Sequence, residues 1–128
     1  MKTLTLSIKQ IYFDQILAGT KTIESREVKP SNASKYVYFT DLDSHKEYKN
    51  WSDIPDNVGN ICVEPVMYDS IRLLTGAYKG KRPSCTVEVK GAEVIFLMDD
   101  NEEQVYYDAD GIEFPALVVD YQLGAILV

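Results

Sequence analysis

Apolar and polar residues alternate over Thr3–Ile8, which is the period of a half-buried β-strand. The apolar spacing then lengthens to three and four residues, which predicts a short helix over residues 10–18. Ser7 and Gln10 have the spacing of a capping box at the start of this helix, and Gly19 has the place of a left-handed C-terminal cap. The residues expected on the buried helix face are Ile8, Ile11, Tyr12 and Ile16.

From residue 20 onward the strand period dominates. Gly91 is expected to separate two strands, and Gly124 to interrupt the last one. Residues 41–59 are polar, which predicts a long loop with one short helical turn near residues 44–50; loops of this length are often functional. The predicted strands cover residues 20–28, 36–40, 61–63, 68–74, 84–90, 94–98, 104–107 and 116–128. One helix followed by many strands predicts a mainly β fold with few helices (α+β), as a barrel or a tightly curled sheet.

Length and composition indicate one folded domain over residues 1–128. Hydrophobic residues make up 45% of the chain and aromatic residues 11%, which is typical of a folded rather than a disordered chain. No apolar run approaches the roughly 20 residues that span a bilayer, and the N-terminus has no signal-peptide pattern. We therefore expect a cytoplasmic protein with no membrane partner. The sequence leaves the oligomeric state open.

The histidine and cysteine content argues against several kinds of chemistry. His45 is the only histidine, which makes a His-based metal site or a Ser/His/Asp triad hard to build. Cys62 and Cys85 lie in apolar contexts without CxxC spacing, so buried free thiols are expected. The sequence therefore predicts no metal site and no cofactor.

The net charge limits the nucleic acids that the protein is expected to hold. The chain carries 13 Lys and Arg against 20 Asp and Glu, for a formal net charge of −7. Proteins that grip a long duplex use a basic face, because counterion release from the phosphates drives that affinity. We therefore expect no binding of long duplex DNA. Any nucleic-acid contact is expected to be local, with a nucleotide or a short single strand.

The segment from Gly19 to Arg26 carries the densest candidate chemistry. It places Lys21, Glu24 and Arg26 within six residues, directly after the predicted helix end. Strand alternation puts Glu24 and Arg26 on one face, and Lys21 joins them if it lies in the turn before the strand. One interpretation is a ligand site built from these three side chains. The alternative is a half-solvated strand in which Glu24 and Arg26 are exposed charges.

This segment resembles the signature of the ASCH domain, named for activating signal cointegrator homology. Gly19-x-Lys21-x-x-Glu24-x-Arg26 matches the family pattern G-x-K-x-x-E-x-R. The match extends backward through the predicted first strand and helix and, more loosely, forward into the later strands. The resemblance implies a PUA-like β-barrel with a short helix after the first strand. It also implies a cleft beside that helix, lined by the motif residues.

The resemblance further implies two classes of function. Domains of this kind are thought to bind RNA. Small stand-alone members include a hydrolase that removes the acyl group from N4-acetylcytidine, and others have been linked to RNA cleavage. In the amidohydrolase pattern a lysine at the position of Lys21 acts with a threonine, and this chain has Glu24 at the threonine position. Under the hydrolase or nuclease hypothesis, Lys21 and Glu24 are the catalytic residues.

We predict first an RNA- or modified-nucleoside-binding module, because a carboxylate beside Lys21 favours an ion-paired ammonium that binds a phosphate or a carbonyl over a free-amine nucleophile. The expected partner is a short RNA, a nucleotide or a modified nucleoside. The alternatives are a small metal-independent amidohydrolase acting on an acylated cytidine-type base and a protein–protein adaptor, which the acidic surface allows. The predicted binding residues are Lys9, Lys21, Glu24, Arg26 and Trp51.

Two further candidates lie outside the motif. Trp51, in the long loop, offers a ring for stacking on a base, or it folds back to cover the edge of the barrel. Lys79, Lys81 and Arg82 form a basic cluster that either steers phosphates or is a solvated hairpin tip.

Overall fold

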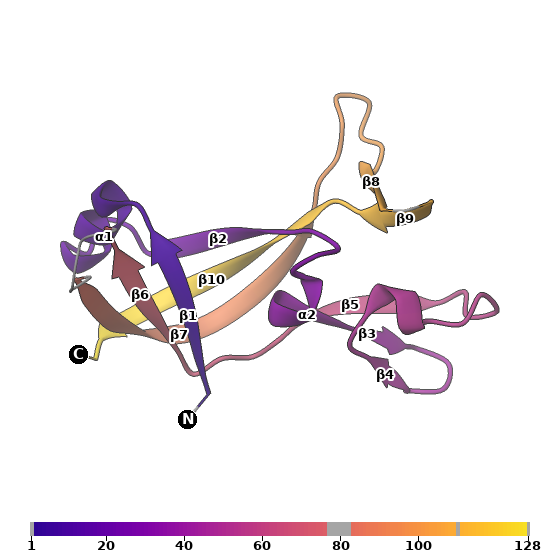
Figure 1. Ribbon diagram of the computed structural model, residues 1–128, viewed down its shortest axis with the longest axis horizontal. Helices are drawn as coiled ribbons and strands as arrows, with labels where there is room; N and C mark the ends of the chain where they lie inside the picture. The colour runs from indigo at the N-terminus through magenta and orange to yellow at the C-terminus, as the bar shows by residue number, and fades with distance from the viewer. Residues whose placement is uncertain (1, 77–82, 110, 128) are drawn as a thin grey trace. The chain divides into compact units, whose positions relative to one another are not determined.

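A computed structural model describes residues 2–76, 83–109 and 111–127 (Figure 1). Strands account for 52% of it and helices for 13%, which confirms the predicted mainly β class. The strands are β1 (Thr3–Ile8), β2 (Ile23–Val28), β3 (Val37–Asp41), β4 (Glu47–Tyr48), β5 (Ile61–Pro65), β6 (Ser70–Thr75), β7 (Ser84–Phe96), β8 (Tyr106–Ala109), β9 (Ile112–Pro115) and β10 (Leu117–Ile126). The helical segments are α1 (Gln10–Leu17), α2 (Ala33–Tyr36) and the 3-10 turn η1 (Trp51–Asp53).

Five strands form a curled sheet in the order β1-β6-β7-β10-β2 (Figure 1). β1 and β6 run parallel, with Thr3 opposite Ser70 and Ile8 opposite Thr75. β6 and β7 are antiparallel. A parallel pair needs a long connection between its strands, and here α1 and all the chain up to β6 supply it.

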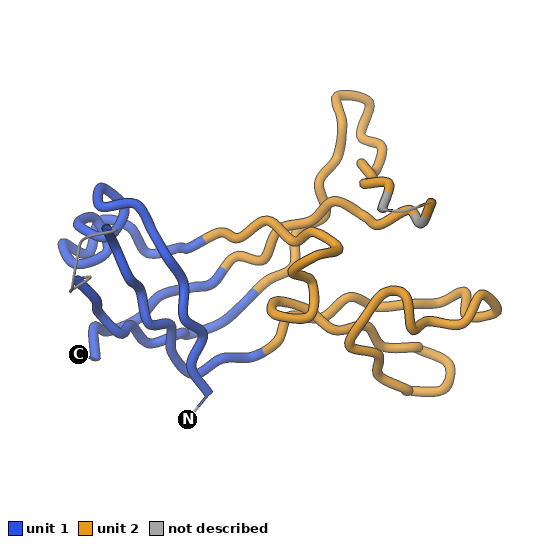
Figure 2. Tube along the Cα trace, viewed as in Figure 1, with its two compact units in different colours: residues 1–24, 67–92, 121–128 blue, residues 25–66, 93–120 orange. Residues whose placement is uncertain are grey.

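The chain divides into two compact units, coloured separately in Figure 2. The first unit comprises residues 1–24, 67–92 and 121–128, and the second comprises residues 25–66 and 93–120. β2, β7 and β10 each contribute residues to both units. The single domain over residues 1–128 stays a prediction, and the units are described one at a time below.

The core of the first unit lies between α1 and the sheet strands of that unit. Its buried apolar residues are Leu4, Leu6, Phe13, Ile16, Ile71, Leu73, Cys85, Val87, Tyr121 and Leu123. β1 buries Leu4 and Leu6 and half-buries Ile8, in the alternation that its sequence predicted. The predicted helix is confirmed, but its predicted buried face is wrong in part, because Ile11 and Tyr12 are 60% and 42% exposed. Apolar residues surround most of this short helix, so the contact with the sheet, rather than the spacing, selects the buried face.

The predicted capping box is also wrong. Lys9 is the N-cap residue of α1, and no side chain caps the helix. Ser7 is instead a residue of β1, paired with Leu74 of β6, because the parallel ladder continues to Ile8. The side chain of Gln10 accepts a hydrogen bond from Thr75 Oγ1 at 3.2 Å. The C-terminal end of the helix follows the prediction, since Gly19 has a φ of 79°.

Two glycines that were expected to break strands lie inside continuous strands. β7 continues through Gly91, where a Cβ atom would lie 3.2 Å from Gln122 Oε1. β10 continues through Gly124, where a Cβ atom would overlap the Glu88 carboxylate and lie 2.9 Å from Lys90 Cγ. At both positions the glycine, which has no side chain, leaves room for a side chain of the adjacent strand. Neither glycine ends its strand.

The second unit holds a three-stranded antiparallel sheet, in the order β4-β3-β5, and the hairpin β8–β9. The predicted strands 36–40 and 61–63 correspond to β3 and β5. The predicted long loop contains β4 and η1, and the turn after β8 leads into β9; the sequence patterns revealed neither β4 nor β9. The buried apolar residues of this unit are Val28, Ala33, Tyr36, Val37, Phe39, Phe114, Ala116, Leu117 and Val119. Within the described residues, no helix has the length and apolar character needed to cross a membrane.

Candidate functional site

Lys21 lies between the end of α1 and the start of β2, as the motif predicted. Its backbone is held by the helix that precedes it: the N–H groups of Thr20 and Lys21 both donate to the carbonyl of Gln15, at 3.0 and 3.1 Å. The positive φ of Gly19 turns the chain back to make these bonds possible. The helix end therefore fixes the point from which the lysine side chain projects.

The Lys21 ammonium has three partners within the first unit. Nζ donates to the Ile23 carbonyl at 2.7 Å and lies 3.8 Å from Glu24 Oε1. It also lies 5.3 Å from the centre of the Tyr12 ring, within the range of a cation–π contact. A carbonyl, a carboxylate and an aromatic face are all partners of a protonated amine. The Lys21 side chain is 23% exposed to solvent, so a ligand can reach it.

Glu24 is buried, with 6% of its surface exposed. The alternative interpretation, in which Glu24 is an exposed charge on a solvated strand, is therefore wrong. The burial pattern of β2 places Glu24, Arg26 and Val28 on the inward face, as strand alternation predicted. The structure thus brings Lys21 and Glu24 together in one contact.

Tyr12 takes part in the Lys21 contact, which the sequence patterns did not reveal. They assigned its ring to the helix core, whereas 42% of its surface is exposed and Lys21 lies over the ring. The exposed apolar residues Ile11, Leu17 and Ile23 come from the same helix and from the start of β2. An ammonium beside an accessible ring can bind a molecule that combines an anionic or carbonyl group with a flat ring.

Arg26 and Lys9 are the other basic residues that the sequence predicted in the ligand site. Arg26 belongs to the second unit and is half-buried. Lys9 is the exposed N-cap of α1, and its carbonyl accepts from the N–H groups of Tyr12 and Phe13 at 3.1 and 3.0 Å. The convergence of Arg26 and Lys9 on a common ligand with Lys21 stays a prediction.

Trp51 is held in the second unit by contacts on several sides. Its Nε1–H donates to the Glu113 carbonyl at 3.0 Å. Its ring meets Phe39 and Phe114 edge to face, with centroids 5.2 and 5.6 Å away. The alternative that Trp51 folds back on the protein therefore describes its packing, while base stacking by this residue stays a prediction.

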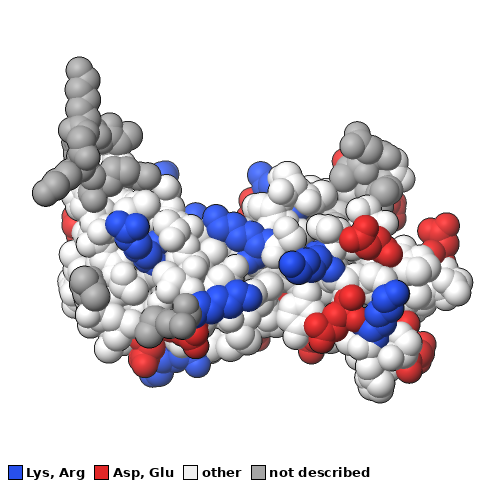
Figure 3. Space-filling model, turned by 60° about the horizontal axis from the view of Figure 1, so that its bottom comes forward, with Lys and Arg blue, Asp and Glu red and all other residues white. Residues whose placement is uncertain are grey.

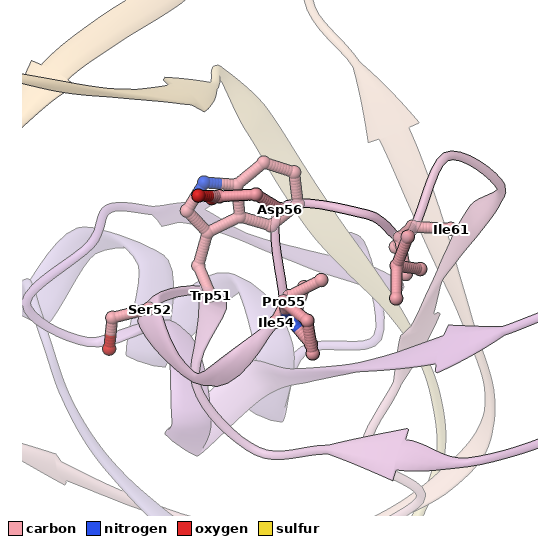
Figure 4. Close-up of a pocket in the computed structure, with 7 residues that line it drawn as sticks. Trp51, Ser52, Ile54, Pro55, Asp56 and Ile61 are labelled. Carbon is pink, nitrogen blue, oxygen red and sulfur yellow. The ribbon is translucent and has the colours of Figure 1, made fainter.

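The same tryptophan lines a pocket of about 270 Å³, shown in Figure 4 and named here the η1 pocket. All of its lining residues come from η1 and the segment up to the start of β5. They are Trp51, Ser52, Ile54, Pro55, Asp56, Val58 and Ile61. The length of the polar loop was the only sequence signal for this pocket.

Ionisable groups outside the motif include some with shifted pKa values. Hydrogen bonds from the Ser44 hydroxyl and the Asp43 N–H lower the pKa of Asp41, at the turn between β3 and β4. Burial, then the neighbouring Glu64, raises the pKa of Tyr38. The pKa of Tyr107 is raised by its hydrogen bond to Glu27, and that of the Cys85 thiol by burial. These groups lie in strand contacts and turns, and none belongs to the Lys21 contact.

Basic and acidic side chains both appear on the face drawn in Figure 3. The predicted basic cluster of Lys79, Lys81 and Arg82 lies outside the described residues. In the part of the chain that is described, no group of three or more His, Cys, Asp and Glu side chains comes together to hold a metal ion. Cys62 is half-buried and Cys85 buried, and both are free thiols.

Comparison with known proteins gave no family model that matches the sequence, no similar curated protein and no solved structure with a matching fold. The functional interpretation therefore depends on the residues and contacts described above, together with the resemblance of the motif.

Proposed function

We propose that this protein is an ASCH-type, PUA-like module that binds a short RNA, a nucleotide or a modified nucleoside through Lys21. The observation that carries the proposal is the position of the Lys21 ammonium, which is fixed by Ile23 and Glu24 and still partly accessible. A phosphate or a carbonyl oxygen of the ligand accepts from this ammonium. The motif resemblance supports the same assignment, and the cleft beside α1 is part of the proposal.

Tyr12 contributes the second element of recognition in this proposal. Its ring is accessible at the surface of α1 and is already paired with the Lys21 ammonium on one side. Unpaired bases stack on aromatic side chains with little dependence on their sequence, and each stack contributes about 1–3 kcal/mol. Lys21 and Tyr12 together therefore suit one phosphate or carbonyl and one base.

The contacts of Lys21 favour binding over amide hydrolysis. A lysine that acts as base or nucleophile needs a free amine, whereas Lys21 Nζ already donates to the Ile23 carbonyl and lies 3.8 Å from Glu24 Oε1. Glu24 also lacks the hydroxyl that the amidohydrolase pattern has at this position. An ammonium held in this way is suited to charge-assisted hydrogen bonding with a ligand.

The binding test compares wild type with two variants, using the anisotropy of a fluorescently labelled single-stranded RNA of eight nucleotides. Lys21→Ala removes the ammonium, and Tyr12→Ala removes the ring. Each is expected to weaken binding by about tenfold, the effect of losing one charge-assisted hydrogen bond or one stack. Lys49→Ala is the matched control, because Lys49 is an exposed lysine of the second unit and gives the same change in net charge.

The salt dependence and a turnover assay complete the test. Because the net charge is −7, the slope of log affinity against log salt is expected to correspond to one to three phosphates, rather than the roughly six to ten of a strong duplex binder. If Lys21→Ala and Lys49→Ala bind equally well, the proposal is wrong. Repeated turnover of N4-acetylcytidine by wild type, lost in Lys21→Ala, would instead favour the hydrolase.

A further inference from the structure

The η1 pocket combines three kinds of lining surface in the second unit (Figure 4). One wall is the indole of Trp51, four residues are aliphatic, Ser52 completes the lining, and Asp56 supplies a carboxylate. The aliphatic residues are Ile54, Pro55, Val58 and Ile61. Small-molecule sites have this composition, with apolar walls and a few polar groups that fix orientation.

The walls of the pocket are held by the backbone on both sides of Asp56. The Val58 N–H donates to the Pro55 carbonyl at 3.1 Å, which closes the turn that presents Asp56. The Ile54 N–H donates to the Trp51 carbonyl at 3.3 Å, and the indole itself is anchored by its bond to Glu113. The pocket is therefore already formed without a ligand, so binding requires little loss of conformational entropy in the residues that line it.

Charge decides the kind of ligand. Asp56 is the one charged residue of the lining, it is exposed, and among the described residues no hydrogen bond or ion pair engages its carboxylate. An indole attracts a cation over its face, which adds to the attraction of the carboxylate. The net charge of −7 raises the local concentration of cations and repels anions.

We infer that the η1 pocket binds a small organic cation, in which a primary ammonium or a guanidinium is carried on a compact apolar body. The cationic group pairs with Asp56, and the body packs between Trp51 and the aliphatic walls. The volume of about 270 Å³ is near the lower end of ligand pockets, which run from about 300 to 1,000 Å³, so the body is no larger than one ring with a short chain. This inference is independent of the proposed function, because Lys21 and Tyr12 are not in the pocket.

Phenethylamine is a suitable probe, and Trp51, the chain's single tryptophan, gives the readout. The titration follows the Trp51 emission and the one indole N–H signal in a ¹H–¹⁵N correlation spectrum. Phenethylamine is expected to give a saturable change in both. The neutral analogue 2-phenylethanol is expected to bind at least about tenfold more weakly, because it lacks the charge-assisted hydrogen bond to Asp56.

Asp56→Asn keeps the shape of the lining and removes its charge, and it is expected to weaken phenethylamine binding by about tenfold. Asp43→Asn is the matched control, since Asp43 is an exposed carboxylate of the same unit that does not line the pocket. The inference is overturned if the amine and the alcohol bind equally, if Asp56→Asn binds as well as Asp43→Asn, or if cytidine binds while the amine does not. No saturable change with the amine in either signal would also overturn it, and RNA binding through Lys21 would be unaffected by any of these outcomes.

Discussion

The ion pair between Lys21 and Glu24 predicts a stability effect that depends on which charge is removed. Lys21→Met keeps an aliphatic stem of similar length and removes the ammonium. Glu24 is then left at 6% exposure with one cationic partner fewer. Because a buried carboxylate is costly without its countercharge, we expect the free energy of unfolding to fall. The double variant Lys21→Met/Glu24→Met also removes the buried carboxylate. It is therefore expected to recover part of the free energy of unfolding that Lys21→Met loses.

The size of the effect follows from the geometry of the pair. At 3.8 Å, Coulomb's law gives an attraction of about 4 kcal/mol at an effective dielectric constant of roughly 20. The Lys21 side chain is 23% exposed, so solvent screens part of this attraction. Exposed pairs contribute about 0.2–1 kcal/mol, whereas breaking a buried pair costs about 3–5 kcal/mol. The expected loss for Lys21→Met is therefore about 1–3 kcal/mol, and the double variant is expected to recover about 1 kcal/mol of it.

Urea unfolding followed by far-ultraviolet circular dichroism measures these differences, provided that the dependence on urea is the same for all variants. Lys49→Met serves as control, since an exposed lysine is expected to change stability by no more than about 0.5 kcal/mol. Equal midpoints for Lys21→Met and Lys49→Met would show that the Lys21 ammonium does not stabilise the fold through Glu24. So would a double variant that is less stable than Lys21→Met, because the buried carboxylate would then not be the source of the cost.

Three further predictions concern the scaffold. Phe114 is 1% exposed, and Phe114→Ala removes its ring from the core of the second unit. The free energy of unfolding in urea is expected to fall by about 3–5 kcal/mol. A loss below about 1 kcal/mol would contradict the ring packing. Gly124→Ala places a Cβ against the exposed side chains of Glu88 and Lys90, which then have to move, and is expected to cost about 0.5–1.5 kcal/mol, the cost of a side chain held off its rotamer. Gly59→Ala, with open space around it, is the neutral control, and equal stability of the two variants would contradict the close approach. The hydrogen bond from Ser44 lowers the pKa of Asp41, so the ionised Asp41 stabilises the fold above about pH 4, and this stabilisation is lost as the pH falls through the lowered pKa. The urea midpoint of wild type is therefore expected to fall more steeply with acid than the midpoint of Asp41→Asn. Parallel pH profiles of the two proteins would contradict this.

Local sequence signals predicted the parts of the fold that depend on neighbouring residues. The alternation over Thr3–Ile8 gave the first strand with both of its ends. Gly19 gave the end of α1, because a left-handed residue there needs no partner elsewhere in the chain. The placement of Lys21 in the turn before β2 followed from that helix end. These features depend on backbone conformation and spacing, which a sequence carries directly.

Long-range packing decided the features that the sequence patterns missed. The buried face of α1 is chosen by the sheet, so the exposure of Tyr12 was not predicted. Gly91 and Gly124 resemble strand breaks in the sequence, yet each is opposite a side chain of another strand. A glycine required by a distant neighbour has the same sequence appearance as a glycine that ends a strand.

The sequence predicted which residues form the candidate site better than it predicted how these residues are arranged. The motif spacing indicated that Lys21 and Glu24 meet, and their contact at 3.8 Å confirms this. The depth of Glu24 and the ring of Tyr12 under the ammonium depend on how α1 and β2 pack, which the motif does not encode. For the η1 pocket, the only sequence signal was the length of the loop. Backbone turns within residues 51–61 bring the walls of the pocket together, and the sequence patterns did not predict these turns.

Ligand binding at Lys21 is tested by a titration of ¹⁵N-labelled protein with cytidine monophosphate and with the eight-nucleotide RNA. We predict saturable shifts of backbone amide signals within residues 10–24, with the same set of signals moved by both ligands. These shifts are expected to be lost in Lys21→Ala and kept in Lys49→Ala. Saturable binding that leaves residues 10–24 unmoved, or that is unchanged in Lys21→Ala, would contradict a ligand site built on Lys21.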